Sequence, residues 1–369
     1  MRKFLVLLFL ASQASAQTWR FAVAGDSRNC GDVVMPAIAA GVKASGAAFY
    51  WHLGDLRALV KIDEDMAREA KTPYLITDYL RLAWPDFIRN QIAPFSPTPF
   101  YLGIGNHETV LGRTRGDFVV QFGDWLTRPE IQRQRLADDP NDHVVRPYYH
   151  WIQGGVDFIN MDNASSDQFD NAQMVWVKRI LDRDSADPRV KTVVVGMHAA
   201  LPHSLGCDHS MNEWTQGEYS GNVVYHALLD FREKSRKNVY VIASHTHFLI
   251  RDPYDTAYWR AHGGVLPGVL IGTAGAVRYR LPDTVQGFPP ERARTDVYGY
   301  LVGTVDANGA ITIEFHQIDR AAIPAEVENR YGAEFVNWCF NENRDPNPRS
   351  SAKCAAADAP SGPTITPRP

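Results

Sequence analysis

Short apolar runs recur along the chain, and each of them ends in polar side chains. The segments are residues 21–26, 47–55, 99–108, 156–163, 192–198 and 239–247. Their Val, Ile, Phe and Tyr residues follow one another with little alternation, which is typical of strands buried on both faces. The polar residues at their ends can bind metals, and they are Asp26, Asp55, Asn106 with His107 and Glu108, Asp162 with Asn163, His198, and His245 with His247.

Helical patterns lie between these runs, at residues 35–45, 76–92, 172–184 and 223–235. Strands that alternate with helices predict an α/β sheet covered by helices. In such sheets ligands bind beyond the carboxyl ends of the strands. We therefore expect the polar side chains at the strand ends to converge on one site.

The last third of the chain adds antiparallel strands. Residues 268–276 form another apolar run, and residues 298–305 and 310–318 flank the turn "DANG" as in a β-hairpin. The fold class predicted is α/β, with two packed mixed β-sheets flanked by helices in four layers. We expect one domain over residues 17–320 and a C-terminal extension over residues 321–369, which ends in a proline-rich, extended tail.

The first sixteen residues have the pattern of a signal peptide. Arg2 and Lys3 precede a short apolar run, and Ala14-Ser15-Ala16 is a cleavage site of the A-x-A type. A membrane anchor is the alternative, but the run is too short to span a bilayer. We expect cleavage after Ala16 and export of a soluble protein to a bacterial periplasm or the outside.

Charge and cysteine content narrow the function classes. The formal net charge is −4 and the basic residues are scattered, which argues against a nucleic-acid partner. Four cysteines in an exported chain indicate disulfides, with three pairings open. We expect Cys339 to pair with Cys354 and Cys30 with Cys207, although one or more free thiols remain an alternative.

The gathered side chains indicate a transition-metal site. They are Asp26, Asp55, Asn106, His107, His198, His245 and His247. Carboxylate, amide and imidazole ligands together suit Mn, Fe or Zn better than Ca or Mg. Two such ions ~4 Å apart can hold a phosphoryl group and generate hydroxide to attack it. A lone histidine is more often a core residue, so the inference depends on the order of five elements at strand ends.

The motifs "GDSR", "GDL", "GNHE", "GMH" and "SHTH" resemble, in this order, the signature of the calcineurin-like metallophosphoesterase superfamily. That signature runs D-x-H, G-D, G-N-H-D/E, H and G-H-x-H, and the resemblance covers residues 20–318. "DNAQMVWVKRIL" and "IGTAGA" are similar to the branch that contains purple acid phosphatases. The resemblance implies a metallophosphoesterase-like sandwich of two sheets.

The resemblance also implies roles for individual residues. It implies that Asp55 bridges two metal ions. Asp26 and His247 would hold the first ion. The second ion would be held by Asn106, His198 and His245. His107 would be the acid at the leaving group, with its ring oriented by a nearby carboxylate, and Glu108 would support the ligands from behind.

Arg28 departs from the family pattern. It stands where D-x-H has a histidine ligand, and an arginine has no lone pair to offer a metal. The tyrosine that purple acid phosphatases use instead is here Ala58. We therefore expect a first site that is weak or empty, and an Arg28 that grips substrate phosphate. A salt bridge from Arg28 to a neighbouring carboxylate such as Asp32 is the alternative.

The loop after His198 carries candidate substrate contacts in His203, His209 and Trp214, although an ordinary surface loop is equally compatible with the sequence. The function expected is an exported phosphoesterase that hydrolyses small phosphate esters by metal-bound hydroxide. A phosphodiesterase of the same fold and a non-catalytic binding protein on a degenerate phosphatase scaffold are the alternatives.

Overall fold

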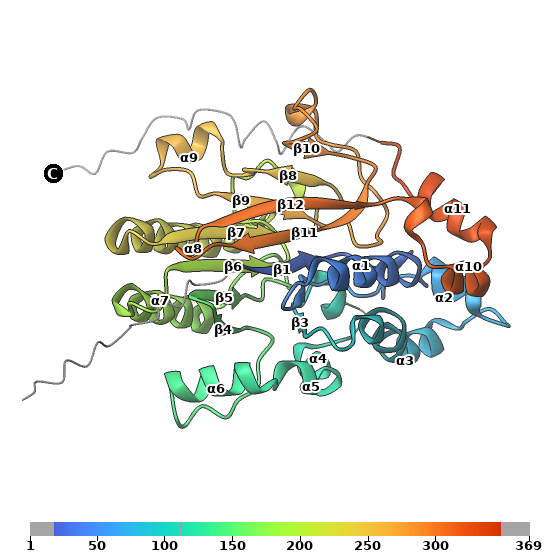
Figure 1. Cartoon of the computed structure of the whole chain (residues 1–369), viewed down its shortest axis with the longest axis horizontal. Helices are drawn as coiled ribbons and strands as arrows, with labels where there is room; N and C mark the ends of the chain where they lie inside the picture. The colour runs from blue at the N-terminus through green and yellow to red at the C-terminus, as the bar shows by residue number, and fades with distance from the viewer. Residues whose placement is uncertain (1–17, 111, 348–369) are drawn as a thin grey trace, which may run out of the picture.

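Two mixed β-sheets pack face to face between layers of helices (Figure 1). The computed structural model describes residues 18–110 and 112–347. The five-stranded sheet has the order β12-β11-β1-β2-β3. Its strands are β1 (Trp19–Ala24), β2 (Tyr50–His52), β3 (Phe100–Leu102), β11 (Tyr298–Val305) and β12 (Ile311–Ile318). β1, β2 and β3 are parallel, whereas β11 and β12 run antiparallel to their neighbours.

The seven-stranded sheet has the order β10-β8-β9-β7-β6-β5-β4. Its strands are β4 (Tyr149–Gln153), β5 (Val156–Asn160), β6 (Thr192–Met197), β7 (Asn238–Ala243), β8 (Leu249–Arg251), β9 (Gly268–Ile271) and β10 (Ala293–Arg294). The four central strands β5, β6, β7 and β9 are parallel, so their carboxyl ends share one edge.

Aromatic side chains fill the space between the sheets. The Phe158 ring from the second sheet packs edge-on against Phe21 and Phe49, with centroids 5.0 Å apart in both pairs. Trp51 packs against Trp151 across the same interface. Gly196 lies beneath Trp51, and a Cβ there would overlap the indole. The interface therefore requires a residue without a side chain at this point of β6.

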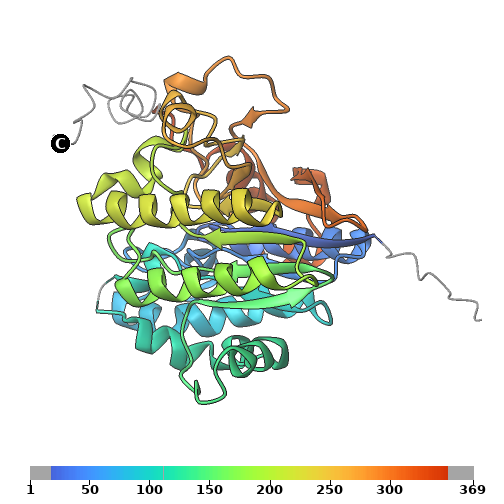
Figure 2. The same cartoon turned by 90° about the vertical axis from the view of Figure 1, so that its left-hand side faces the viewer.

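Helices cover the outer faces. Around the first sheet and its edges are α1 (Gly31–Ser45), α2 (Glu64–Glu69), α3 (Ile76–Phe87), α4 (Arg115–Gln121) and α5 (Gly123–Leu126), while α6 (Pro129–Asp138) packs on β4 at the edge of the second sheet. The second sheet carries α7 (Asn171–Ala186), α8 (Thr215–Ser235) and α9 (Ala257–Ala261). Figure 2 shows α7 and α8 side by side over that sheet. No helix of the described residues is long and apolar enough to cross a membrane.

The predicted fold class and the hairpin of β11 and β12 are confirmed. All four predicted helices differ from their observed bounds, and two of them differ by five residues or more. The pattern over residues 76–92 is an α-helix only to Phe87 and continues as a π-turn over Ile88–Ile92, just after Pro85, which cannot donate a backbone hydrogen bond. α8 begins at Thr215, eight residues before the predicted start, because its first turns are largely polar.

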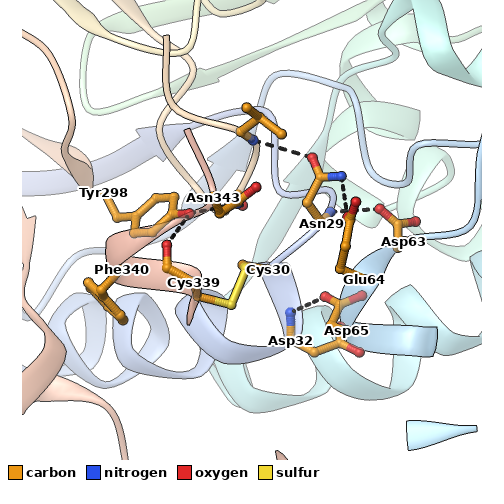
Figure 3. The surroundings of a disulfide bond; sticks show 12 residues. Asn29, Cys30, Asp32, Asp63, Glu64, Asp65, Tyr298, Cys339, Phe340 and Asn343 are labelled. Atoms are coloured by element: carbon orange, nitrogen blue, oxygen red, sulfur yellow. Dashed lines mark hydrogen bonds between the residues drawn. A yellow bond between two sulfur atoms is a disulfide. The ribbon is translucent and has the colours of Figure 1, made fainter. Parts of the chain in front are cut away.

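The expected disulfide pairing is wrong. Cys30 pairs with Cys339, 309 residues further along the chain (Figure 3). The C-terminal extension folds back as α10 (Ala325–Tyr331) and α11 (Ala333–Asn341), and α10 packs on α1 and α2, which brings Cys339 to the start of α1. Cys207 is also disulfide-bonded, while Cys354 and the residues of the predicted signal peptide lie outside the described part of the chain.

Candidate metal centre

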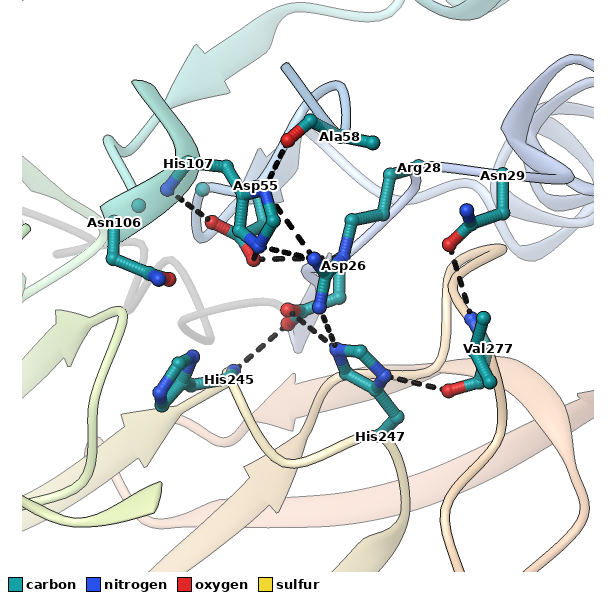
Figure 4. A network of polar contacts seen from close by, with 12 residues as sticks. Asp26, Arg28, Asn29, Asp55, Ala58, Asn106, His107, His245, His247 and Val277 are labelled. Carbon is teal, nitrogen blue, oxygen red and sulfur yellow. Dashed lines mark hydrogen bonds and ion pairs between the residues drawn. The ribbon is translucent and has the colours of Figure 1, made fainter. Parts of the chain in front are cut away.

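Five strands deliver the predicted ligands to one place (Figure 4). Asp26 follows β1, Asp55 follows β2, and Asn106 with His107 follows β3. His198 directly follows β6, and a short turn after β7 carries His245 and His247. The carboxyl edges of both sheets therefore face one site, as the strand pattern predicted.

Three of these residues have a left-handed backbone. The φ angles are 61° at Asp26, 58° at Asp55 and 65° at His245. Such conformations cost on the order of 1–3 kcal/mol for a residue with a side chain, and they cluster at functional sites. The neighbouring backbone also approaches closely, since a Cβ at Gly272 would lie 2.7 Å from Asp26 Oδ2. The chain turns sharply at each strand end, and the turn directs the side chain inward.

Four side chains form a cluster that could hold a metal ion. Asp26, Asp55, His198 and His245 each offer one ligand atom, and these atoms all lie within 4.8 Å of one another. Asp26 Oδ1, Asp55 Oδ2 and His245 Nδ1 are buried without a hydrogen-bond partner. Buried, unpaired carboxylate oxygens are costly in the absence of a cation. The donor set therefore fits a divalent transition-metal ion.

His198 is held in position from behind. Its Nδ1 lies 3.1 Å from both Leu53 O and Ser244 Oγ, which can accept its proton. Its Nε2 faces Asn106 Oδ1 at 2.9 Å and Asp55 Oδ1 at 3.3 Å. A backbone carbonyl at the rear nitrogen is the usual way to orient a metal-binding imidazole. Asn106 is thus adjacent to the cluster, as predicted.

His247 lies beside Asp26, on the first-ion side of the site. Its Nδ1 donates to Val277 O at 2.6 Å, and its Nε2 is 3.2 Å from Asp26 Oδ1. Its ring stacks on Tyr279 with centroids 3.9 Å apart. Burial, followed by the nearby charge of Arg28, lowers the pKa of His247 to about 4, so its imidazole is neutral at physiological pH.

Arg28 points into the site. Its Nη2 is 3.0 Å from His247 Nε2, its Nη1 contacts His107 Nε2, and its Nε is 3.7 Å from Asp55 Oδ2. Burial alone would lower the pKa of Arg28, but Asp55 and other neighbours raise it overall. The ion pair of Arg28 is therefore with Asp55, whereas Asp32 pairs with Arg57 at 2.6 Å.

His107 and Glu108 organise the same edge. His107 Nδ1 contacts the backbone carbonyl of Ala58, so a carbonyl rather than a carboxylate orients the ring from that side. Burial lowers the pKa of His107, and Asp55 opposes this shift. The Glu108 carboxylate accepts backbone N–H groups of Gly105, Asp55 and Leu56 at 2.8, 2.9 and 3.0 Å. Burial raises the pKa of Glu108 to about 8.

A cavity of about 540 Å³ opens beside Asn106 and His245. His209 and Trp214 line it, and the His209 ring lies 4.6 Å from the His245 ring. Trp214 is 54% exposed, which leaves its face free for a ligand. His203 does not line this cavity. Its ring stacks on that of Tyr258, with the ring centroids 3.5 Å apart. The structure therefore brings two of the three loop candidates to the cavity.

Sequence reasoning missed Arg57, which is fully buried behind the site. Its guanidinium contacts Asp32 at 2.6 Å, Asp65 at 2.9 Å, and Asp86. These carboxylates come from α1, α2 and α3, so Arg57 ties the loop after Asp55 to three helices. The D-x-R spacing of Asp55 and Arg57 repeats that of Asp26 and Arg28, and this repeat was the available signal.

Asp162 is not among the predicted metal ligands. It ends a predicted strand with a metal-competent group, but its carboxylate pairs with Arg115 at 2.6 Å and lies outside the four-residue cluster. Its neighbour Asn163 bonds the backbone of Ala199 through both ends of its amide. These two residues fix the loop after β5 instead of binding an ion.

Comparison with known proteins gives a limited result. No protein-family model matches the chain, and no curated protein matches it. Among solved structures 33 chains match, and they include PhoD, which is 14% identical with a TM-score of 0.49. That match covers 90% of this chain and 78% of PhoD. A likeness at this level carries no argument about activity, so the residues of the site must supply one.

Proposed function

We propose that this chain is an exported, metal-dependent phosphoesterase that acts on small phosphorylated molecules. One observation carries the proposal: Asp26, Asp55, His198 and His245 offer ligand atoms within 4.8 Å of one another, and two carboxylate oxygens and one imidazole nitrogen among them have no hydrogen-bond partner. A transition-metal ion bound there would polarise a phosphoryl oxygen and lower the pKa of a bound water.

The surrounding side chains have matching roles in this proposal. Arg28 offers a planar fork of N–H donors, which suits two oxygens of a phosphate. His107 lies on the opposite side of that guanidinium and would donate a proton to the leaving group once protonated. The cavity lined by His209 and Trp214 would receive the organic part of the substrate.

The test is the variant His198→Ala, with His316→Ala as its control because His316 is 40% exposed on β12, away from the cluster. We expect His198→Ala to lose bound metal and to lose hydrolysis of a panel of phosphate monoesters and diesters, while the control keeps both. Elemental analysis measures the metal, and release of phosphate or alcohol measures turnover.

Two results would contradict the proposal. Unchanged metal content in His198→Ala would remove this residue from the metal centre. A metal-loaded wild-type chain that hydrolyses neither monoesters nor diesters would overturn the enzymatic function and would favour a binding protein on the same scaffold.

A further inference from the structure

The guanidinium of Arg28 lies where the first metal ion of a two-ion centre would need its ligands. Asp26, Asp55 and His247 are the three donors left for that ion. Arg28 lies 3.0 Å from His247 Nε2 and 3.7 Å from Asp55 Oδ2, so it already contacts two of the three ligand atoms. The first site therefore does not fit a metal ion while Arg28 has this conformation.

The lone pair of His247 is committed to Arg28. Val277 O accepts from Nδ1 at 2.6 Å, which places the ring proton there and leaves the lone pair on Nε2. Arg28 Nη2 donates to that lone pair. A metal ion at the first site would need the same lone pair, because an imidazole nitrogen cannot accept from a guanidinium and bind a cation at once.

His107 also lies against Arg28. Ala58 O contacts Nδ1, and Nε2 faces Arg28 Nη1. Two imidazoles from different sheets thus hold the guanidinium between them, with a carboxylate alongside (Figure 4). The backbone around Arg28 is fixed as well, since Ser27 N donates to Asp55 O at 3.0 Å and Asn29 N donates to Asp63 Oδ1 at 2.6 Å.

Charge favours the same arrangement. Asp26 and Asp55 carry two negative charges at the centre, and one divalent ion with one guanidinium already exceeds them by a single positive charge. A second divalent ion would face both the first ion and Arg28 at short range, where like charges repel strongly. One excess positive charge suits a phosphate, and a second ion has no remaining carboxylate to balance it.

We propose that the centre binds one metal ion, through Asp26, Asp55, His198 and His245, and that Arg28 is a permanent second cation that replaces the first ion. This inference rests on the proposed function and defines the form of its active site. It also makes Arg28 a catalytic residue, since its free N–H groups would contact the substrate phosphate.

The experiment measures how many Mn²⁺ ions each chain binds at equilibrium, by calorimetric titration and by elemental analysis after dialysis. We expect one ion for the wild type and two for Arg28→His, which supplies a lone pair where the guanidinium was. Arg28→Ala should also admit a second ion, more weakly, and serves if the histidine variant does not fold. Arg20→His, at an exposed position of β1, controls for a histidine added elsewhere.

Electron paramagnetic resonance gives a second readout that does not depend on activity. The Mn²⁺ spectrum should be that of isolated ions in the wild type and of coupled ions in Arg28→His. Two ions in the wild type would overturn the inference and leave the proposed function standing. One ion in both Arg28 variants would also overturn it. No ion in the wild type would overturn the proposed function and the inference with it.

Discussion

Replacing Arg57 by methionine should destabilise the packing of the three helices that hold the loop after Asp55. Arg57 pairs with Asp32, Asp65 and Asp86 together, and its side chain is fully buried. Methionine keeps much of the volume and removes the charge. Three buried carboxylates are then left without their common partner, and they anchor the loop that begins at Asp55.

The expected loss is large. Removal of one partner from a buried ion pair costs about 3–5 kcal/mol, because the remaining charge is left unpaired. Native domains have a total free energy of unfolding of about 5–15 kcal/mol, so Arg57→Met should lose about a fifth of it or more. Arg89→Met is the matched control, since Arg89 also pairs with Asp86 but its side chain is 65% exposed. The free energy of unfolding of Arg89→Met should fall by no more than about 1 kcal/mol.

Acid should rescue the Arg57 variant in part. Burial already raises the pKa of Asp86 to about 6 and that of Asp65 well above its ordinary value, despite Arg57. Without Arg57 these folded-state pKa values rise further above the unfolded values. The stability of the variant is then retained at low pH and lost as the pH rises through the folded-state values.

Urea unfolding of both variants and the wild type at about pH 5 and about pH 7.5 measures this difference. We expect the deficit of Arg57→Met to be larger at the higher pH. The reasoning is refuted by a cost no greater than that of Arg89→Met, or by a deficit that grows on acidification.

Three further predictions concern catalysis, covalent structure and pH. His107→Ala should keep its metal and lose turnover by roughly 10²–10⁴-fold, with alkyl phosphates affected more than nitrophenyl phosphate; equal losses would argue against an acid at the leaving group. Cys339→Ser breaks the bond to Cys30 and should lower the free energy of unfolding by about 2–5 kcal/mol, measured by urea titration without reductant; a loss below about 0.5 kcal/mol would contradict this. Burial and Asp157 raise the pKa of Asp184 from 3.8 to about 8, so the wild type should lose stability as the pH rises through this range. Asp184→Asn should not lose stability in this way, so its free energy of unfolding relative to that of the wild type should increase with pH. A difference between the two that does not change with pH would refute the raised pKa of Asp184.

The strand ends could be predicted from the sequence because they depend on a simple regularity. Uninterrupted apolar runs mark strands covered on both faces, and parallel strands present their carboxyl ends at one edge. Asp26, Asp55 and His198 follow such runs closely, and all three belong to the four-residue cluster. The pattern says nothing of which way a side chain turns after the strand, and so it gave Asp162 the same status as Asp55.

The disulfide could not be predicted for a different reason. Cys30 and Cys339 are 309 residues apart, and their contact depends on how the C-terminal helices fold back over α1 and α2. Pairing by sequence proximity favoured Cys354, which is the nearest cysteine to Cys339. The apolar pattern of the extension predicts helices but does not indicate which surface they cover, because an amphipathic helix can pack on any apolar face.

The two D-x-R motifs show what decides between a functional and a structural arginine. Arg28 and Arg57 each stand two residues after a ligand aspartate whose backbone is left-handed. Arg28 meets two imidazoles and a carboxylate within the site, whereas Arg57 meets three helix carboxylates behind it. The aspartate turns cost on the order of 1–3 kcal/mol each, and the contacts of the following arginine hold the turn in place. Sequence spacing locates both turns, but the surrounding helices determine that one arginine supports the fold while the other faces the candidate metal centre.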